Sequence, residues 1–134
     1  MTMAKMPKEV MDLFNDAQAA KVLATVNADG VPNVVPVGTL AAVNEEMIAF
    51  ADIFLGKTKS NLEATKKVAA AAYKGLDGYQ IKGTFQGFQT SGPLFEQMGK
   101  TVKETLKLET KAVGTIKVEE VYSVGVKAPG KKIA

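Results

Sequence analysis

The segment FADIFLGKTKSNL, residues 50–62, joins an apolar strand to a polar loop and then to the start of a helix. Ser60, followed three residues later by Glu63, has capping-box spacing, so we expect the helix to begin at Asn61. The first N–H groups of a helix have no partner within it and attract anions. The segment therefore predicts a phosphate site. The alternative is a capped helix start with two solvated lysines.

The residues before the expected helix supply suitable donors for a phosphate. Gly56 permits close approach of the backbone, and Lys57 and Lys59 carry positive charge. The hydroxyls of Thr58 and Ser60 can donate to phosphate oxygens. The Gly-x-x-x-x-Gly-Lys spacing of a Walker loop is absent, so we expect neither a kinase nor a nucleotide hydrolase.

The composition limits the chemistry of the chain. Its 134 residues are 46% hydrophobic, which predicts one globular domain over residues 1–134. The absence of Cys and His excludes the usual zinc sites, iron–sulfur clusters, thiol or Ser-His nucleophiles and His-ligated haem. All 17 basic residues are Lys, so no Arg can clamp an anion in bidentate fashion. Any difficult chemistry would need an organic cofactor.

Charge and hydropathy bear on partners and location. The net charge of +3 is spread along the chain, which argues against nucleic acid as a partner. The apolar runs are shorter than the ~20 residues of a membrane span, and residues 1–8 do not resemble a signal peptide. We therefore expect a cytoplasmic protein with no membrane contact.

Hydrophobic periodicity predicts an α+β protein that is mainly β. We expect helices over residues 7–19, 61–67 and 94–108, and strands over residues 21–26, 33–43, 47–51, 68–73, 79–89, 113–118 and 121–126. Hairpin-connected strands with helices at the ends predict an antiparallel barrel. The core face of the last helix should carry Phe95, Met98, Val102 and Leu106. Pro36 and Gly38 interrupt the second strand, which indicates a bulge or the close approach of a ligand to the backbone.

Several segments, taken in order, resemble the FMN-binding split-barrel family, which includes relatives of pyridoxamine phosphate oxidase and small bacterial FMN-binding proteins. The match covers roughly residues 10 to 126 in order and spacing. The resemblance implies a six- or seven-stranded antiparallel split β-barrel that binds FMN. The segments that carry it are DGVP (29–32), VVPV (34–37), IAF (48–50), KTKSNL (57–62), VA (68–69) and IKG (81–83).

The resemblance implies two contacts with the FMN phosphate. Lys57 and Thr58 match the phosphate-contacting loop of the family, where the helix-start argument also places an anion. Asn61 would orient this loop by hydrogen bonding, or is a plain first-turn residue. Lys82 is a candidate second phosphate contact, with a solvated lysine on the barrel face as the alternative.

The resemblance also implies where the isoalloxazine ring lies. Residues 35–38 would run along the ring, and residues 50–53 would meet the ring and the ribityl chain. A carboxylate at Asp52 would oppose the negative charge of a reduced flavin, so the alternative for Asp52 is that it points to solvent. The implied cofactor-binding residues outside the phosphate loop are Val35, Pro36, Val37, Gly38, Phe50, Ala51, Asp52 and Leu55.

The family builds its flavin site at a two-fold interface, so the resemblance implies a homodimer with FMN between the subunits. We expect residues 127–134 to form a mobile or partner-contacting tail that reaches the partner's flavin. The Arg and His residues that hold the substrate phosphate in pyridoxamine phosphate oxidase are absent here, which excludes that activity.

The predicted function is that of an FMN-binding flavoprotein. It would transfer electrons, or oxidise or reduce a small substrate, with a small molecule or a redox protein as its electron partner. No side chain is suited to act as a general base for a substrate, so catalytic residues stay unassigned. The alternatives are a deazaflavin-dependent reductase of the same fold and a non-redox ligand-binding module.

Overall fold

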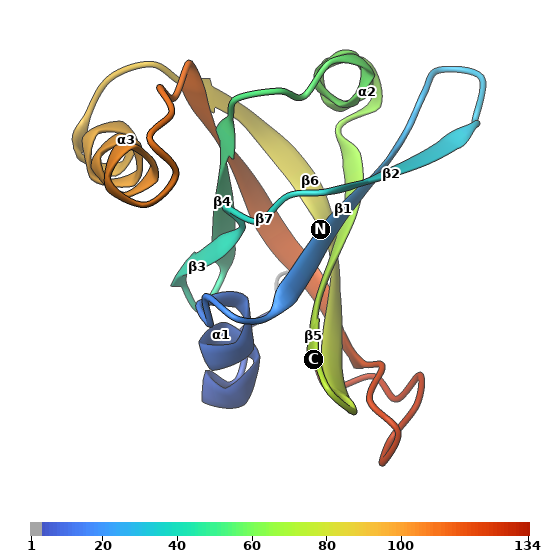
Figure 1. Ribbon diagram of the computed structural model, residues 1–134. Coiled ribbons are helices and arrows are strands. Elements are labelled where there is room, and N and C mark those ends of the chain that lie inside the picture. The colour runs from blue at the N-terminus through green and yellow to red at the C-terminus, as the bar shows by residue number, and fades with distance from the viewer. Residues whose placement is uncertain (1–3) are drawn as a thin grey trace.

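The computed structural model describes residues 4–134, which contain one antiparallel sheet of seven strands and three helices (Figure 1). The strand order is β2-β1-β5-β6-β7-β4-β3, so β2 and β3 are the edges, and the sheet curls without closing between them. This confirms the predicted α+β class and the split antiparallel barrel. The elements are α1 (Lys8–Phe14), β1 (Ala20–Val26), β2 (Pro32–Pro36), β3 (Ala41–Asn44), β4 (Met47–Asp52), α2 (Lys57–Thr65), β5 (Lys67–Lys74), β6 (Asp77–Gln89), α3 (Pro93–Leu106) and β7 (Ala112–Ser123).

Some boundaries differ from those predicted. The strand expected over residues 33–43 is two strands, because β2 ends at Pro36 and a turn follows in which Leu40 N–H donates to Val37 O at 3.3 Å. The last two expected strands are one continuous strand, β7, with a register shift opposite Lys82 and Gly83 in place of a break. The first helix ends at Phe14, before a turn in which Gln18 N–H donates to Asp16 Oδ1 at 2.8 Å.

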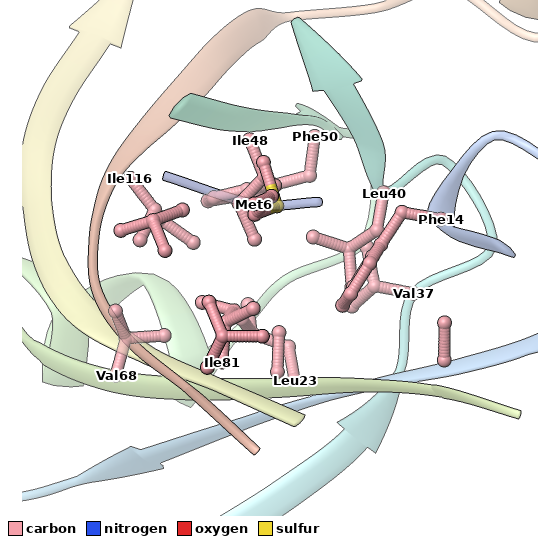
Figure 2. Packing of buried hydrophobic residues seen from close by; sticks show 14 of the residues in the cluster. Met6, Phe14, Leu23, Val37, Leu40, Ile48, Phe50, Val68, Ile81 and Ile116 are labelled. Atoms are coloured by element: carbon pink, nitrogen blue, oxygen red, sulfur yellow. The ribbon is translucent and has the colours of Figure 1, made fainter. Parts of the chain in front are cut away.

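The core fills the inside of the curled sheet. Side chains from α1, the β2–β3 turn and the strands β1, β4, β5, β6 and β7 meet there (Figure 2). Phe14 and Phe50 are its largest fully buried side chains. Burial of this apolar surface stabilises the fold, at roughly 25 cal/mol for each Å² removed from water.

Close strand packing explains one of the glycines in the long strand β6. A Cβ atom on Gly83 would lie 2.1 Å from Lys117 O and 2.9 Å from Ile116 Cγ2 on β7. Because no side chain fits there, glycine lets β6 and β7 pair across a sharp bend. Gly83 thus permits the strong curvature of this barrel strand.

The final residues fold back along the second half of β7. Ile133 N–H donates to Val121 O at 2.7 Å, and Ser123 N–H donates to Lys131 O at 2.8 Å. The tail is therefore hydrogen-bonded within its own chain, and its contact with a partner stays a prediction. No helix within residues 4–134 is long and apolar enough to cross a membrane.

Candidate functional site

The helix that follows β4 begins earlier than the capping-box spacing predicts. Its N-cap is Gly56, at φ +56°, and the helix runs from Lys57. A residue with a side chain would be strained in this left-handed conformation, so glycine determines where the helix starts. Ser60 is exposed within the helix, so the prediction that it caps a helix beginning at Asn61 is wrong.

Polar side chains hold the start of α2 against the β1–β2 hairpin. Asn33 Nδ2 donates to Thr58 Oγ1 at 3.1 Å, and Asn61 Nδ2 donates to Thr25 Oγ1 at 3.1 Å. One turn further along α2, Thr65 Oγ1 donates to Val26 O at 2.9 Å. Because these groups are buried or half-buried, each hydrogen bond avoids the cost of an unsatisfied polar atom. Together they fix the position of the predicted phosphate loop.

In this arrangement the side chains of Thr58 and Asn61 are not available to contact a phosphate. Thr58 has no exposed surface and Asn61 has 9%, so neither side chain faces solvent where a phosphate would arrive. Asn61 orients the loop by hydrogen bonding, but its partner is Thr25 on β1. Lys57 is exposed at the first helical position. In this chain Lys57 is the residue of the Lys57–Thr58 pair whose side chain is free to meet an anion.

Asp52 forms a buried ion pair at the end of β4. Its Oδ2 lies 3.1 Å from Lys59 Nζ, and its side chain is 4% exposed against 43% for that of Lys59. The contact is an ion pair without hydrogen-bond geometry, since Oδ2 has no hydrogen-bond donor. Lys59 Nζ also lies 5.1 Å from the centre of the Phe88 ring, a cation–π contact. The expectation that Asp52 points to solvent is therefore wrong.

The ion pair affects the electrostatics of the predicted phosphate loop. Lys59 is held by Asp52, so the two charges largely offset each other. The carboxylate that would oppose a reduced flavin is thus neutralised from within the chain. It also means that Lys59 contributes less positive charge to a phosphate than the sequence suggests.

The backbone N–H groups of residues 35–38, predicted to lie along the ring, differ in whether they are free to bind a ligand. Val37 N–H donates to Lys21 O at 3.0 Å, so antiparallel alternation also turns the backbone of Val35 toward β1. Pro36 has no N–H to offer. Gly38 is exposed, and its N–H has no hydrogen-bond partner within residues 4–134. Gly38 is therefore the backbone donor of residues 35–38 that is free to meet a ligand.

Nothing in the fold itself requires glycine at position 38. A Cβ atom there would meet no heavy atom within 4 Å, and φ lies outside the left-handed region that favours glycine. Glycine at an unstrained, open position leaves room for close approach to the backbone. The residues present thus fit a planar group laid against this turn.

Phe50 and Ala51, at the end of β4, pack beneath the turn that joins β2 to β3. Ala51 N–H donates to Thr39 Oγ1 at 2.9 Å, so the backbone N–H of this implied cofactor-binding residue already has a partner. Phe50 is fully buried and stands edge-on to Phe88, with ring centres 6.2 Å apart. Leu55 is half-buried. Phe50 and Ala51 shape the site without offering surface to a ligand.

Comparison with known proteins identifies the family. The pyridoxamine 5'-phosphate oxidase family matches residues 6–125. The chain belongs to this family. No curated protein matches it significantly in sequence.

Solved structures of other proteins share the fold of this chain. HupZ from Group A Streptococcus is 27% identical with a TM-score of 0.81, and the match covers 96% of this chain and 99% of that one. An FMN-binding protein from Syntrophomonas wolfei is 20% identical with a TM-score of 0.81, over 89% and 86% of the two chains. HutZ, the heme storage protein from Vibrio cholerae, is 15% identical with a TM-score of 0.66, over 88% and 94%. At these lower identities the last two show a common fold.

Lys82 lies apart from the phosphate loop within one chain. It is exposed on β6, where it pairs in register with Glu120 on β7, and its Nζ lies 5.2 Å from the Tyr122 ring centre. The Tyr122 hydroxyl in turn donates to the Glu120 carboxylate. No contact within residues 4–134 joins Lys82 to Lys57, so a shared phosphate contact stays a prediction.

Sequence reasoning missed Thr25, Asn33 and Thr39. Thr25 and Asn33 face each other across the β1–β2 hairpin, and both lie on the inward side of their strands. Polar residues at inward positions of alternating strands need hydrogen-bond partners, and this was the available signal. The identity of those partners depends on where α2 docks.

Proposed function

We propose that this chain is an FMN-binding flavoprotein that forms a homodimer with one FMN per subunit. The observation that carries the proposal is Gly38, whose backbone is open and unstrained and whose N–H has no partner within residues 4–134. The next residue, Thr39, accepts the Ala51 N–H at the end of β4, the strand that leads to Lys57. Membership of the pyridoxamine 5'-phosphate oxidase family supports a flavin, and a similar structure is that of an FMN-binding protein.

Each part of the site has a distinct role in this proposal. The Gly38 N–H donates a hydrogen bond to the ring, and the Lys57 ammonium binds the phosphate at the start of α2. Thr58 and Asn61 hold that helix start in place. Asp52 and Lys59 keep the nearby charge balanced. Bound FMN would supply the capacity to accept and donate electrons, used in electron transfer or in oxidation or reduction of a small substrate.

The proposed dimer uses the outer face of β1, β2 and β5. In register across these strands lie two apolar rows, Val34–Ala24–Ala69 and Pro36–Val22–Ala71. Val34 is 62% exposed. Exposed apolar faces of this kind are typical of interfaces between subunits. Lys82 follows Ala69 in the same row, at the rim of this face.

Haem is less well supported than flavin, although the Vibrio cholerae neighbour is a heme storage protein. The chain has no His and no Cys, the most common axial ligands of haem iron. A flavin needs only backbone and lysine donors, which this site offers.

Mass spectrometry of the small molecule released on denaturation tests the proposal. We expect FMN, and we expect the protein stripped of it to bind FMN more tightly than riboflavin, which lacks the phosphate. In Lys57→Ala the affinity for FMN should fall by about 10- to 100-fold, as for the loss of one charge-assisted hydrogen bond, while that for riboflavin should not change. A deazaflavin in the released fraction, or no binding of either flavin, would contradict the proposal.

A further inference from the structure

A pocket of about 610 Å³ lies between α3 and the turn that joins β2 to β3. In Figure 1, α3 lies to the side of β4, above β3 and α1. The apolar face of α3 borders the pocket through Leu94, Met98, Val102 and Leu106. Only Val102 is buried, and Leu106 is 51% exposed. The helix therefore presents apolar side chains to a space that its own chain leaves unfilled.

A buried lysine borders this space. Lys21 is on the inward side of β1 with Leu23 and Thr25, and it is 8% exposed. Within residues 4–134 its ammonium group forms no hydrogen bond and no ion pair, and Lys21 is the one charged residue that lines the pocket. A buried charge without an opposite partner is unfavourable, so this position favours an anion.

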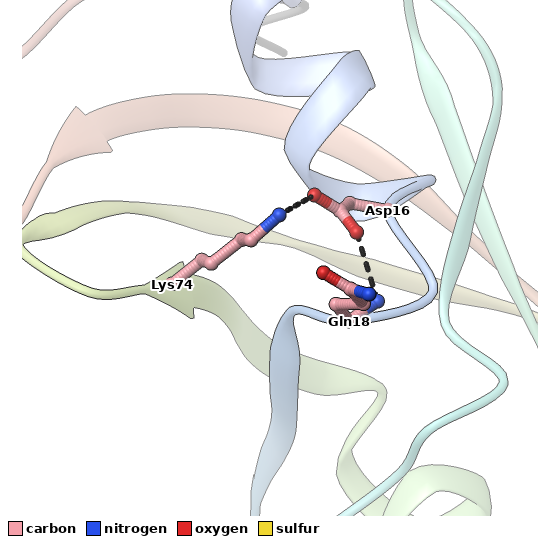
Figure 3. A network of polar contacts seen from close by, with 3 residues as sticks. All are labelled: Asp16, Gln18 and Lys74. Atoms are coloured by element: carbon pink, nitrogen blue, oxygen red, sulfur yellow. Dashed lines mark hydrogen bonds and ion pairs between the residues drawn. The ribbon is translucent and has the colours of Figure 1, made fainter.

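The carboxylate that acts on Lys21 electrostatically, that of Asp16, forms no ion pair or hydrogen bond with it within residues 4–134. Asp16 Oδ2 lies 2.9 Å from Lys74 Nζ, and its Oδ1 accepts the Gln18 N–H (Figure 3). Burial lowers the pKa of Lys21, and the negative charge of Asp16 offsets part of that effect. Asp16 thus acts on Lys21 at a distance while its own hydrogen bonds are made elsewhere.

Most other polar groups around the pocket are already engaged. Thr101 Oγ1 donates to Gln97 O at 3.1 Å, and Thr105 Oγ1 donates to Thr101 O at 2.7 Å. The Asn15 side chain is paired with both the N–H and the C=O of Ala42 on the edge strand β3. A ligand would therefore find apolar walls, one charged group, the Lys21 ammonium, and the unpaired backbone N–H of Gly38.

We propose that this pocket binds a monocarboxylate with an apolar body, whose carboxylate pairs with Lys21 and whose body lies against α3. The volume is within the range of small-molecule sites, and the single charge of the lining matches a single charge on the ligand. A phosphorylated ligand would need more donors than the pocket offers. Gly38 is the one lining residue shared with the predicted flavin contacts, and Lys21, the proposed carboxylate contact, is not among them.

Calorimetry with octanoate and octan-1-ol tests the proposal on the full chain. We expect the wild-type protein to bind octanoate at least about tenfold more tightly than octanol, which is ~1.4 kcal/mol. Lys21→Met keeps an unbranched side chain but removes the ammonium group, so it should lose this preference while still binding octanol. Lys100→Met, on an exposed part of α3 outside the lining, should bind both as the wild type does.

NMR of the unsubstituted protein locates the site without relying on a variant. Addition of octanoate should shift the methyl signals of Met98 and Leu106. Shifts confined to other residues, equal affinity of the wild type for octanoate and octanol, or unchanged octanoate binding in Lys21→Met would each overturn the proposal. Absence of octanoate binding by the wild-type protein would overturn it as well.

Discussion

The helices α2 and α3 are attached to the same sheet in opposite ways. In α2 the buried side combines one apolar residue, Leu62, with the hydrogen-bonded Thr58 and Asn61. In α3 a continuous apolar face is present, yet only Val102 is buried. Specific hydrogen bonds thus position the short polar helix closely, whereas apolar periodicity alone leaves the longer helix above an open pocket. The comparison teaches that hydrophobic pattern shows which face of a helix turns inward, but not how closely it packs.

The largest expected effect on stability comes from a comparison of one leucine in each helix. Leu62→Ala should lower the free energy of unfolding by about 2–5 kcal/mol, because Leu62 is fully buried. Leu106→Ala should change it by no more than about 0.5 kcal/mol, because Leu106 is 51% exposed. Urea unfolding of both variants measures the difference. Similar losses would show that α3 packs as closely as α2.

The ion pair at the start of α2 should give the next largest effect. Lys59→Met leaves the buried Asp52 carboxylate without its partner and should cost about 1–3 kcal/mol, less than for a fully buried pair because Lys59 is 43% exposed. Adding Asp52→Asn should recover part of the loss. A double variant as unstable as the sum of the two single variants would show that the pair is not coupled.

The hydrogen bonds that hold α2 can be measured separately from ligand binding. Thr58→Ala should lower the free energy of unfolding by about 1 kcal/mol, since it removes the acceptor for the half-buried Asn33 amide. Lys57→Ala, at an exposed neighbouring position, should leave stability within about 0.5 kcal/mol of the wild type. Thermal unfolding of the protein without ligand distinguishes the two. A destabilised Lys57→Ala would mean that Lys57 supports the fold.

The smallest expected effect on stability comes from substitution of Asp16, near the α3 pocket. Hydrogen bonds from Lys74 and from the Gln18 N–H lower the pKa of Asp16 below its ordinary value of 3.8 (Figure 3). A lowered pKa in the folded state stabilises the fold above the ordinary value, and this stabilisation is lost as the pH falls through the lowered one. Asp16→Asn should therefore be slightly less stable than the wild type at pH 7, with the difference closing in acid. A difference that is constant with pH would contradict this assignment.

Much of the fold was predictable because the strands alternate clearly. The alternation in residues 21–26 and 79–89 placed β1 and β6 within a few residues of their positions. The start of α2 was misplaced, because Ser60 and Glu63 imitate a capping box while the backbone turn at Gly56 decides the start. Sequence spacing cannot distinguish a helix start at Asn61 from one at Lys57, since the start depends on how α2 packs against Thr25 and Asn33.

The candidate site was predictable in part for a similar reason. Gly38 and Lys57 are exposed, as a ligand contact requires, but Thr58 is buried. The inward turn of Asp52 toward Lys59 could not be deduced from spacing, because it depends on the angle between β4 and α2. The α3 pocket was missed because its lining comes from three separate segments of the chain.

The most direct test of the flavin site is an FMN titration of Gly38→Val beside Gly99→Ala. Both positions have open space around a new Cβ atom, and Gly99 lies on α3, away from the predicted contacts. We predict that Gly38→Val remains folded and binds FMN at least about tenfold more weakly, ~1.4 kcal/mol, while Gly99→Ala binds it as the wild type does. Wild-type affinity in a folded Gly38→Val would contradict the account, because FMN could not then lie against this turn.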